Sequence, residues 1–188
     1  MNYHGGYIPA QPFFELSTDH FISRFGTLSG LLTQYYSFSV AADSQEAVVA
    51  VPDGTVDIIF HCAEITPSAL VCGSVKKGKK IEFSRGDLYF GARFFPTAAE
   101  ELLECPLDQF TDQEISLEEV KHNSADLIEK ITRAASFDRR VKIFEEYHAA
   151  ARTEASPVPT IVSYILDAIH ASLGEIRIQE LEKRTGYS

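Results

Sequence analysis

The stretch Thr55-Val56-Asp57-Ile58-Ile59-Phe60-His61 predicts a β-strand, because strict alternation places Val56, Ile58 and Phe60 on one face. It follows Pro52-Asp53-Gly54, a sequence typical of a tight turn. Further strands are predicted over residues 47–51, 69–75, 80–83 and 88–95. Several short strands at close spacing, with turn signals between them, predict an antiparallel β-barrel of the cupin-like kind or a sandwich.

The spacing of the apolar residues becomes helical after Pro96. Near the N-terminus, residues 28–36 fit either a short helix or a strand. Ser116, with Glu119 three residues on, is a capping box that opens a long helix. The predicted helices cover residues 98–103, 116–135, 137–152, 160–172 and 179–185, and a linker is expected over 153–159. The chain is therefore expected to be an α+β protein, with a β-rich part followed by helices.

Composition narrows the class of protein. The chain has 188 residues, a formal net charge of −10 and 45% hydrophobic residues, which is ordinary for a globular protein. No apolar run is long enough to cross a bilayer, and the N-terminus lacks the features of a signal peptide. The three cysteines form no CxxC pair, which indicates a reducing compartment, so we expect a cytoplasmic protein. The negative charge counts against nucleic acid as a partner of this chain alone.

The end of the sequence nevertheless has the pattern of a helix-turn-helix. An amphipathic helix over 160–172 is followed by Gly174, a short helix over 179–185 and the turn Gly186-Tyr187-Ser188. The glycine accepts the positive φ of a tight turn, and Ser188 is suited to cap a following recognition helix.

Residues 162–188 resemble the opening of the AraC-type DNA-binding domain, which has a second helix like Ile178-Gln179-Glu180-Leu181 and a Gly-Tyr-Ser turn. Glu182 stands where that family has a small residue. Upstream segments resemble the N-terminal domain of one subgroup of these regulators, namely Tyr7-Ile8-Pro9, Val51-Pro52-Asp53-Gly54, Asp57-Ile58-Ile59-Phe60, Gly91-Ala92-Arg93-Phe94-Phe95-Pro96 and residues 107–117. Tyr35-Tyr36 and Lys121-His122 depart from the subgroup, which tends to have Tyr-Trp and Trp-Gly there.

The resemblance implies the regulatory part of a bacterial transcriptional regulator that senses a small effector and controls sequence-specific DNA binding. Residues 1–110 would be the effector-binding domain, 111–153 a helical dimerisation segment, and 157–188 the first part of a truncated helix-turn-helix domain. DNA would then be a partner of the full-length protein only, with Arg184 and Ser188 at most touching phosphates. We expect a homodimer that associates through the helices over 116–135 and 137–152.

Four residues of the predicted strands are candidates for binding the effector: Arg93, Asp57, Tyr89 and His61. Arg93 is suited to hold an anionic group by a forked pair of hydrogen bonds. The competing interpretation is a structural Asp57–Arg93 pair that fixes the strand register, because buried charges are usually paired.

We expect neither metal nor cofactor, and no enzymatic activity. His61 is the only histidine in the nearby strands, whereas such a metal site needs two or three. Glu145 and His148 have the spacing of a helical ligand pair, but di-metal bundles need two such motifs. No nucleophile elbow or phosphate-binding loop is present. The alternative to a regulator is a free-standing small-molecule-binding β-barrel with no DNA role.

Overall fold

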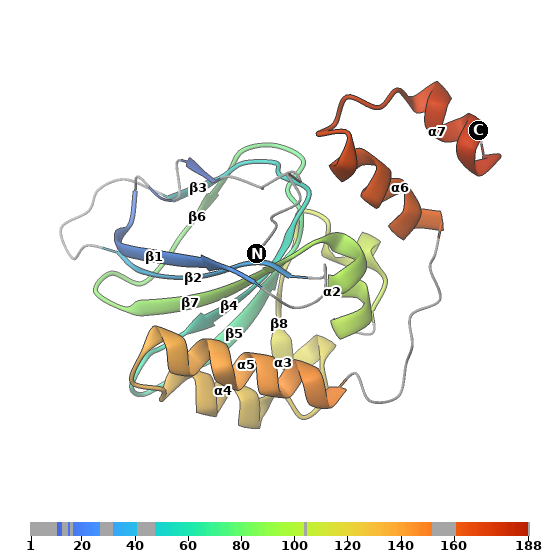
Figure 1. The fold of residues 1–188 in the computed structure, drawn as a ribbon. Coiled ribbons are helices and arrows are strands. Elements are labelled where there is room, and N and C mark those ends of the chain that lie inside the picture. Colours follow the sequence, from blue (N-terminus) through green and yellow to red (C-terminus); the bar gives the residue numbers. More distant parts are fainter. Residues whose placement is uncertain are drawn as a thin grey trace. The chain divides into compact units, whose positions relative to one another are not determined.

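The computed structural model of the chain describes residues 11–12, 15, 17–26, 32–40, 48–103, 105–151 and 161–187. These residues divide between two compact units, one spanning Pro9–Thr153 and one that includes residues 161–187. Both appear in Figure 1, and each is described by itself. The domain boundary expected at residue 110 falls inside the first unit, and the linker expected at 153–159 lies outside the described residues.

A six-stranded antiparallel sheet forms the centre of the first unit. Its order is β1-β2-β7-β4-β5-β8, which places strands far apart in sequence next to one another. The strands are β1 (Asp19–Phe25), β2 (Leu32–Ser39), β7 (Leu88–Phe94), β4 (Val56–His61), β5 (Ser68–Cys72) and β8 (Glu114–Ser116). A second, two-stranded sheet pairs β3 (Val48–Ala50) with β6 (Lys79–Ile81).

The α+β class is confirmed, but the expected closed barrel is not found. Within the described ranges, no strand joins β1 to β8, so the large sheet stays open at both edges. A barrel buries one face of a sheet by closing it. Here helices bury that face instead, so closure is not required.

Helices cover one face of the large sheet, where α4 (Ala125–Thr132) and α5 (Phe137–Ala151) lie side by side (Figure 1). The shorter α2 (Pro96–Leu103), the 3-10 turn η1 (Leu107–Phe110) and α3 (Leu117–Val120) complete this layer. The core beneath it is rich in aromatic and branched residues from both layers, including Tyr35, Ile58, Phe60, Phe90, Phe94, Leu103, Ile131, Val141 and Phe144.

The long helix predicted over 116–135 is divided into α3 and α4. The Ser116 side chain caps α3 as expected, accepting a hydrogen bond from the Glu118 backbone N–H at 3.3 Å. The helix stops at Val120, because Lys121 has an extended backbone with a φ of −135°. Asn123 then adopts a left-handed φ of 62°, a conformation that Asn tolerates better than most residues. A second helix begins at Ala125.

The opposite face of the sheet packs against the β3–β6 pair. Its core contains Tyr36, Phe38, Val40, Val48, Ile59 and Tyr89. The large sheet is therefore apolar on both faces, and the sequence-predicted site residues lie on the side that faces β3 and β6.

The second unit consists of α6 (Ile161–Ala171) and α7 (Ile178–Thr185), which contact each other. Gly186 ends α7 with a left-handed φ of 74°, and its N–H donates to the Glu182 carbonyl at 2.8 Å. No residue of α7 is buried. Across the described residues of both units, no helix has the length and apolar character needed to cross a membrane.

Candidate functional site

The four predicted effector-binding residues lie on one face of two neighbouring strands. Asp57 of β4 is the register partner of Arg93 of β7, and His61 is the partner of Tyr89. Since alternate residues of a strand share a face, all four point toward the same side of the sheet. The Ile59–Gly91 pair separates the two polar pairs.

Arg93 is the centre of a buried ionic cluster. Its side chain is 6% exposed, its Nε donates to Asp57 Oδ1 at 2.9 Å, and its Nη2 donates to Asp57 Oδ2 at 3.3 Å. Its Nη1 lies 3.6 Å from Asp53 Oδ2, and the guanidinium carbon lies 5.4 Å from the centre of the Tyr36 ring. Arg93 is thus the counterion of two buried carboxylates, which is the arrangement that a structural pair requires.

Neighbouring donors satisfy the two carboxylates further. The Tyr36 hydroxyl donates to Asp57 Oδ1 at 3.0 Å. Asp53 Oδ1 accepts hydrogen bonds from the Thr55 backbone N–H at 3.0 Å and from the Thr55 hydroxyl at 2.7 Å. The Gln11 amide donates to Asp53 Oδ2 at 2.8 Å. The cluster is therefore a connected polar network, and such a network stabilises one arrangement of its members.

Gln11 also joins the network to the main chain. Its Nε2 donates to the Val51 carbonyl at 2.7 Å, and its Oε1 accepts from the Val51 N–H at 2.8 Å. The buried Gln11 side chain thereby fixes the segment that leads into Asp53.

The protonation of the cluster follows from burial and charge. Burial raises the pKa of Asp57 above its usual value, against the opposing effect of the Arg93 guanidinium. Burial lowers the pKa of Arg93, but the charges of Asp57, Tyr36 and Asp53 and the hydrogen bond to Asp57 together outweigh burial, so the pKa rises and the guanidinium stays charged. Burial, followed by the charge of Asp57, raises the pKa of Tyr36 well above its usual value, so this phenol remains a hydrogen-bond donor.

A cavity of about 40 Å³ adjoins the network. Its lining includes Tyr36, Asp57, Cys72, Lys79, Arg93 and Glu114. Sites for small organic ligands commonly measure roughly 300–1,000 Å³, whereas one water occupies about 30 Å³. In this conformation the cavity therefore has room for a water molecule or two but not for an organic effector.

His61 and Tyr89 form a separate pair at the other end of the face. Their rings stack with centroids 4.8 Å apart, and His61 Nε2 lies 2.6 Å from Asp87 Oδ2. The Tyr89 hydroxyl accepts a hydrogen bond from the Ser84 N–H at 2.8 Å. These contacts hold the loop before β7 against the end of β4, so the side chains of His61 and Tyr89 both have a structural role.

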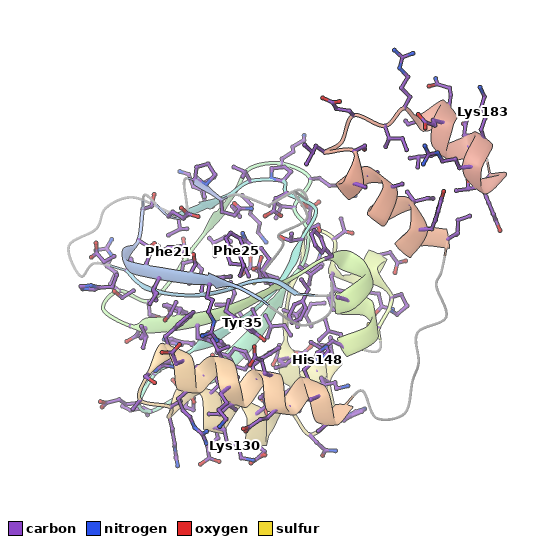
Figure 2. The ribbon with its side chains drawn as sticks, in the orientation of Figure 1. Phe21, Phe25, Tyr35, Lys130, His148 and Lys183 are labelled. Carbon is purple, nitrogen blue, oxygen red and sulfur yellow. The ribbon has the colours of Figure 1, made fainter. Side chains whose placement is uncertain are left out.

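Metal-binding chemistry receives no support from the described part of the chain. There, no group of three His, Cys, Asp or Glu side chains is arranged to hold an ion. His148 is a buried residue near the C-terminal end of α5 (Figure 2).

The two residues expected to touch DNA phosphates belong to the second unit. Arg184 is half-exposed and forms an ion pair with Glu180, one helical turn earlier in α7. The hydrogen bond that Arg184 donates to the Glu180 carboxylate is the first cause that raises the pKa of Arg184. Ser188 lies outside the described residues.

Sequence reasoning missed Gln11, Asp53 and Tyr36 as members of the network. The sequence marks Asp53 as part of a turn and of a segment that resembles AraC-type regulators, and Tyr36 lies in a segment that fits either a helix or a strand. The network could be found only from the register of β4 and β7, which places Asp57 opposite Arg93, 36 residues further along the chain. The sequence alone does not determine that register.

Comparison with known proteins concerns the same region. Residues 26–116 match the DUF6597 domain, a domain of unknown function. The matched residues begin just after β1 and end with β8, so they include Asp53, Asp57 and Arg93 but not Gln11. Searches of curated proteins and of solved structures found no match to the chain.

Proposed function

We propose that this chain is the regulatory part of an AraC-type transcriptional regulator, with the DUF6597 region in its sensing domain. The proposal rests on the presence of a sheet-and-helix unit and of a separate unit with two helices, α6 and α7. It also rests on the order of motifs that resemble one subgroup of that family. The protein would act in the cytoplasm, as a homodimer and without catalysis or a cofactor.

The observation that carries the proposal is the uncovered apolar surface of the second unit. Ile178 at the start of α7 is 71% exposed, and three further large apolar side chains of this unit are also exposed: Tyr164, Leu173 and Tyr187. Isolated short helices are marginally stable in water, so α6 and α7 need further structure to cover them. A helix-turn-helix domain supplies that cover, because its helices pack on one another around a common core.

The charges of α7 are consistent with a supporting helix rather than a base-reading helix. Lys183 and Arg184 are accompanied by Glu180 and Glu182, so the helix has no surplus of positive charge. Bases are read by a recognition helix placed in the major groove. Under this proposal that helix follows the Gly186 turn, and DNA is a partner of the full-length protein.

The sensing part of the proposal concerns the face that contains Arg93. An organic effector does not fit the cavity of about 40 Å³, so its binding would require the lining to move. The same small volume gives no support to the alternative of a free-standing small-molecule-binding protein.

A matched pair of variants tests the proposal in the full-length gene product. Ile178→Glu and Ile65→Glu each replace an exposed isoleucine, the second in the turn between β4 and β5. If the rest of a DNA-binding domain covers Ile178, Ile178→Glu abolishes the enrichment of discrete promoter fragments by chromatin immunoprecipitation, and Ile65→Glu does not. Absence of any enriched site for the parent protein, or equal enrichment for both variants, contradicts the proposal.

A further inference from the structure

A groove of about 560 Å³ lies between α4 and α5. The two helices are joined by residues 133–136, and Figure 1 shows them side by side. Sites for small organic ligands commonly measure roughly 300–1,000 Å³. Unlike the cavity of about 40 Å³ beside Arg93, this groove therefore has room for an organic molecule.

Apolar side chains form the base of the α4–α5 groove. Leu127 of α4 and Ala134 just beyond its end are buried, and Ile143 of α5 is partly buried against the core that contains Leu127. An apolar ligand group that lies over these side chains is removed from water, which favours binding.

The walls of the groove are charged and open to solvent. Three cations line it, namely Lys130, Arg133 and Arg139, whereas two carboxylates do so, those of Asp126 and Glu146. The side chains of Lys130 and Arg133 are 61% and 75% exposed. The described lining thus has a surplus of positive charge, in a chain whose formal net charge is −10.

Two of the three lining cations are paired with carboxylates one helical turn away. Lys130 Nζ lies 2.6 Å from Asp126 Oδ2, and Arg133 Nη1 lies 2.6 Å from Glu129 Oε1. These partners neutralise most of the charge of Lys130 and Arg133.

Arg139 is the third lining cation, and it differs from the other two. Among the residues that the structure describes, no carboxylate forms an ion pair with its guanidinium. Its backbone N–H donates to Ser136 Oγ at 3.3 Å, and its side chain lines the groove. A guanidinium presents a planar fork of donors that matches a carboxylate. The surplus charge of the groove therefore lies on a group suited to bind an organic acid.

We propose that the α4–α5 groove binds a small organic monocarboxylate with an apolar body. Arg139 holds the carboxylate, and Arg133 lies at the same end of the groove, because both flank the connection between the helices. The apolar body lies over Leu127 and Ile143. Glu146 lines the groove about 10 Å further along α5, where it repels a second carboxylate, so a dicarboxylate is disfavoured.

The groove is distinct from the face of β4 and β7 that contains Arg93 and Asp57. As the binding site of the effector, it rests on the proposed regulatory function. As a binding site for a monocarboxylate it does not, because neither α6, α7 nor DNA takes part.

A titration of the 188-residue chain with sodium hexanoate tests the site, followed by two-dimensional NMR of the backbone amides. We expect saturable shifts that centre on α4 and α5, with a dissociation constant on the order of 1 mM for so small a ligand. Acetate has the charge without the apolar body, and hexylammonium has the apolar body with the opposite charge. Each should bind about tenfold more weakly or worse.

A matched pair of variants tests the role of Arg139. Arg139→Ala should raise the dissociation constant of hexanoate about tenfold or more, because it removes the charge-assisted hydrogen bonds to the carboxylate. Arg85→Ala removes another exposed cation, in the turn before β7, and should leave the dissociation constant unchanged. Both arginines are exposed, so we expect both variants to keep the fold, which far-ultraviolet circular dichroism checks.

Four results would overturn the proposal. They are the absence of saturable shifts with hexanoate, shifts that centre outside α4 and α5, equal binding of hexanoate and hexylammonium, and equal affinity of the Arg139→Ala and Arg85→Ala variants for hexanoate. None of these measurements involves DNA or the full-length product, so their failure is distinct from failure of the proposed regulatory function.

Discussion

Replacing Arg93 by alanine should destabilise the first unit strongly and without any ligand present. The substitution leaves the carboxylates of Asp57 and Asp53 buried without their cation. Breaking a buried ion pair in this way typically costs about 3–5 kcal/mol of unfolding free energy. Urea denaturation followed by far-ultraviolet circular dichroism measures this loss, since the chain has no tryptophan.

Two further variants distinguish the stability contributed by the buried cluster from that contributed by surface ion pairs. Arg24→Ala removes an exposed ion pair with Asp138, so it should cost less than about 1 kcal/mol. Adding Asp57→Asn to Arg93→Ala removes one stranded charge, so the double variant should lose less stability than Arg93→Ala alone.

The loss caused by Arg93→Ala should also depend on pH in a defined direction. Burial already raises the pKa of Asp57, and removal of Arg93 takes away the main opposing charge. A carboxyl whose pKa is raised by folding destabilises the fold most when it is ionised. The loss should therefore be larger at pH 8 than at pH 5. A loss below about 1 kcal/mol, or one that grows on acidification, refutes the structural role of the pair. If Arg93 instead serves an anionic effector, the apo variant keeps its stability and loses only the stabilisation by ligand.

Two further predictions concern packing and alkaline pH. Gly73→Ala should cost about 3 kcal/mol or more, because a Cβ there would lie 1.6 Å from the Phe110 carbonyl oxygen. In the control Gly78→Ala, the Cβ would meet its nearest atoms, from Val49 and Ala50, at 3.8 and 4.0 Å, which is ordinary contact. Equal denaturation midpoints for the two variants contradict this prediction. Burial raises the pKa of the Cys62 thiol and of the Tyr36 phenol in the folded state. The stability that the two neutral groups contribute is therefore fully present at pH values below their pKa in the unfolded chain. It is lost as the pH rises from the pKa in the unfolded chain towards the pKa in the folded state. The free energy of unfolding should therefore fall above about pH 9, and stability that stays constant to pH 11 argues against burial of these groups.

The sequence predicted the strands that contain the site better than it predicted how they are arranged. The alternation around Val56 and the run before Pro96 correspond to β4 and β7. The face shared by Asp57 and Arg93 follows from strand parity, but their pairing depends on the adjacency of β4 and β7. That adjacency is a long-range property, because β5 and β6 lie between them in the chain.

Other features lacked a local signal. β1 has no clear alternation of apolar and polar residues, and β8 has only three residues. The segment before Tyr36 remained undecided between helix and strand until its pairing with β7 was known. The expectation of a barrel was wrong for a related reason. Strand count and turn signals do not reveal whether a sheet buries a face by closing or under helices.

We propose that residues 161–187 are the opening of a DNA-binding domain that continues beyond the Gly186 turn. A titration of promoter DNA with the full-length gene product and with the 188-residue chain, side by side at physiological salt, tests it most directly. We expect sub-micromolar, sequence-selective binding by the full-length product. We expect no selective binding by the 188-residue chain, whose net charge is −10 and whose α7 has no surplus of positive charge. Selective binding by the 188-residue chain alone, or its absence from the full-length product, would contradict the account.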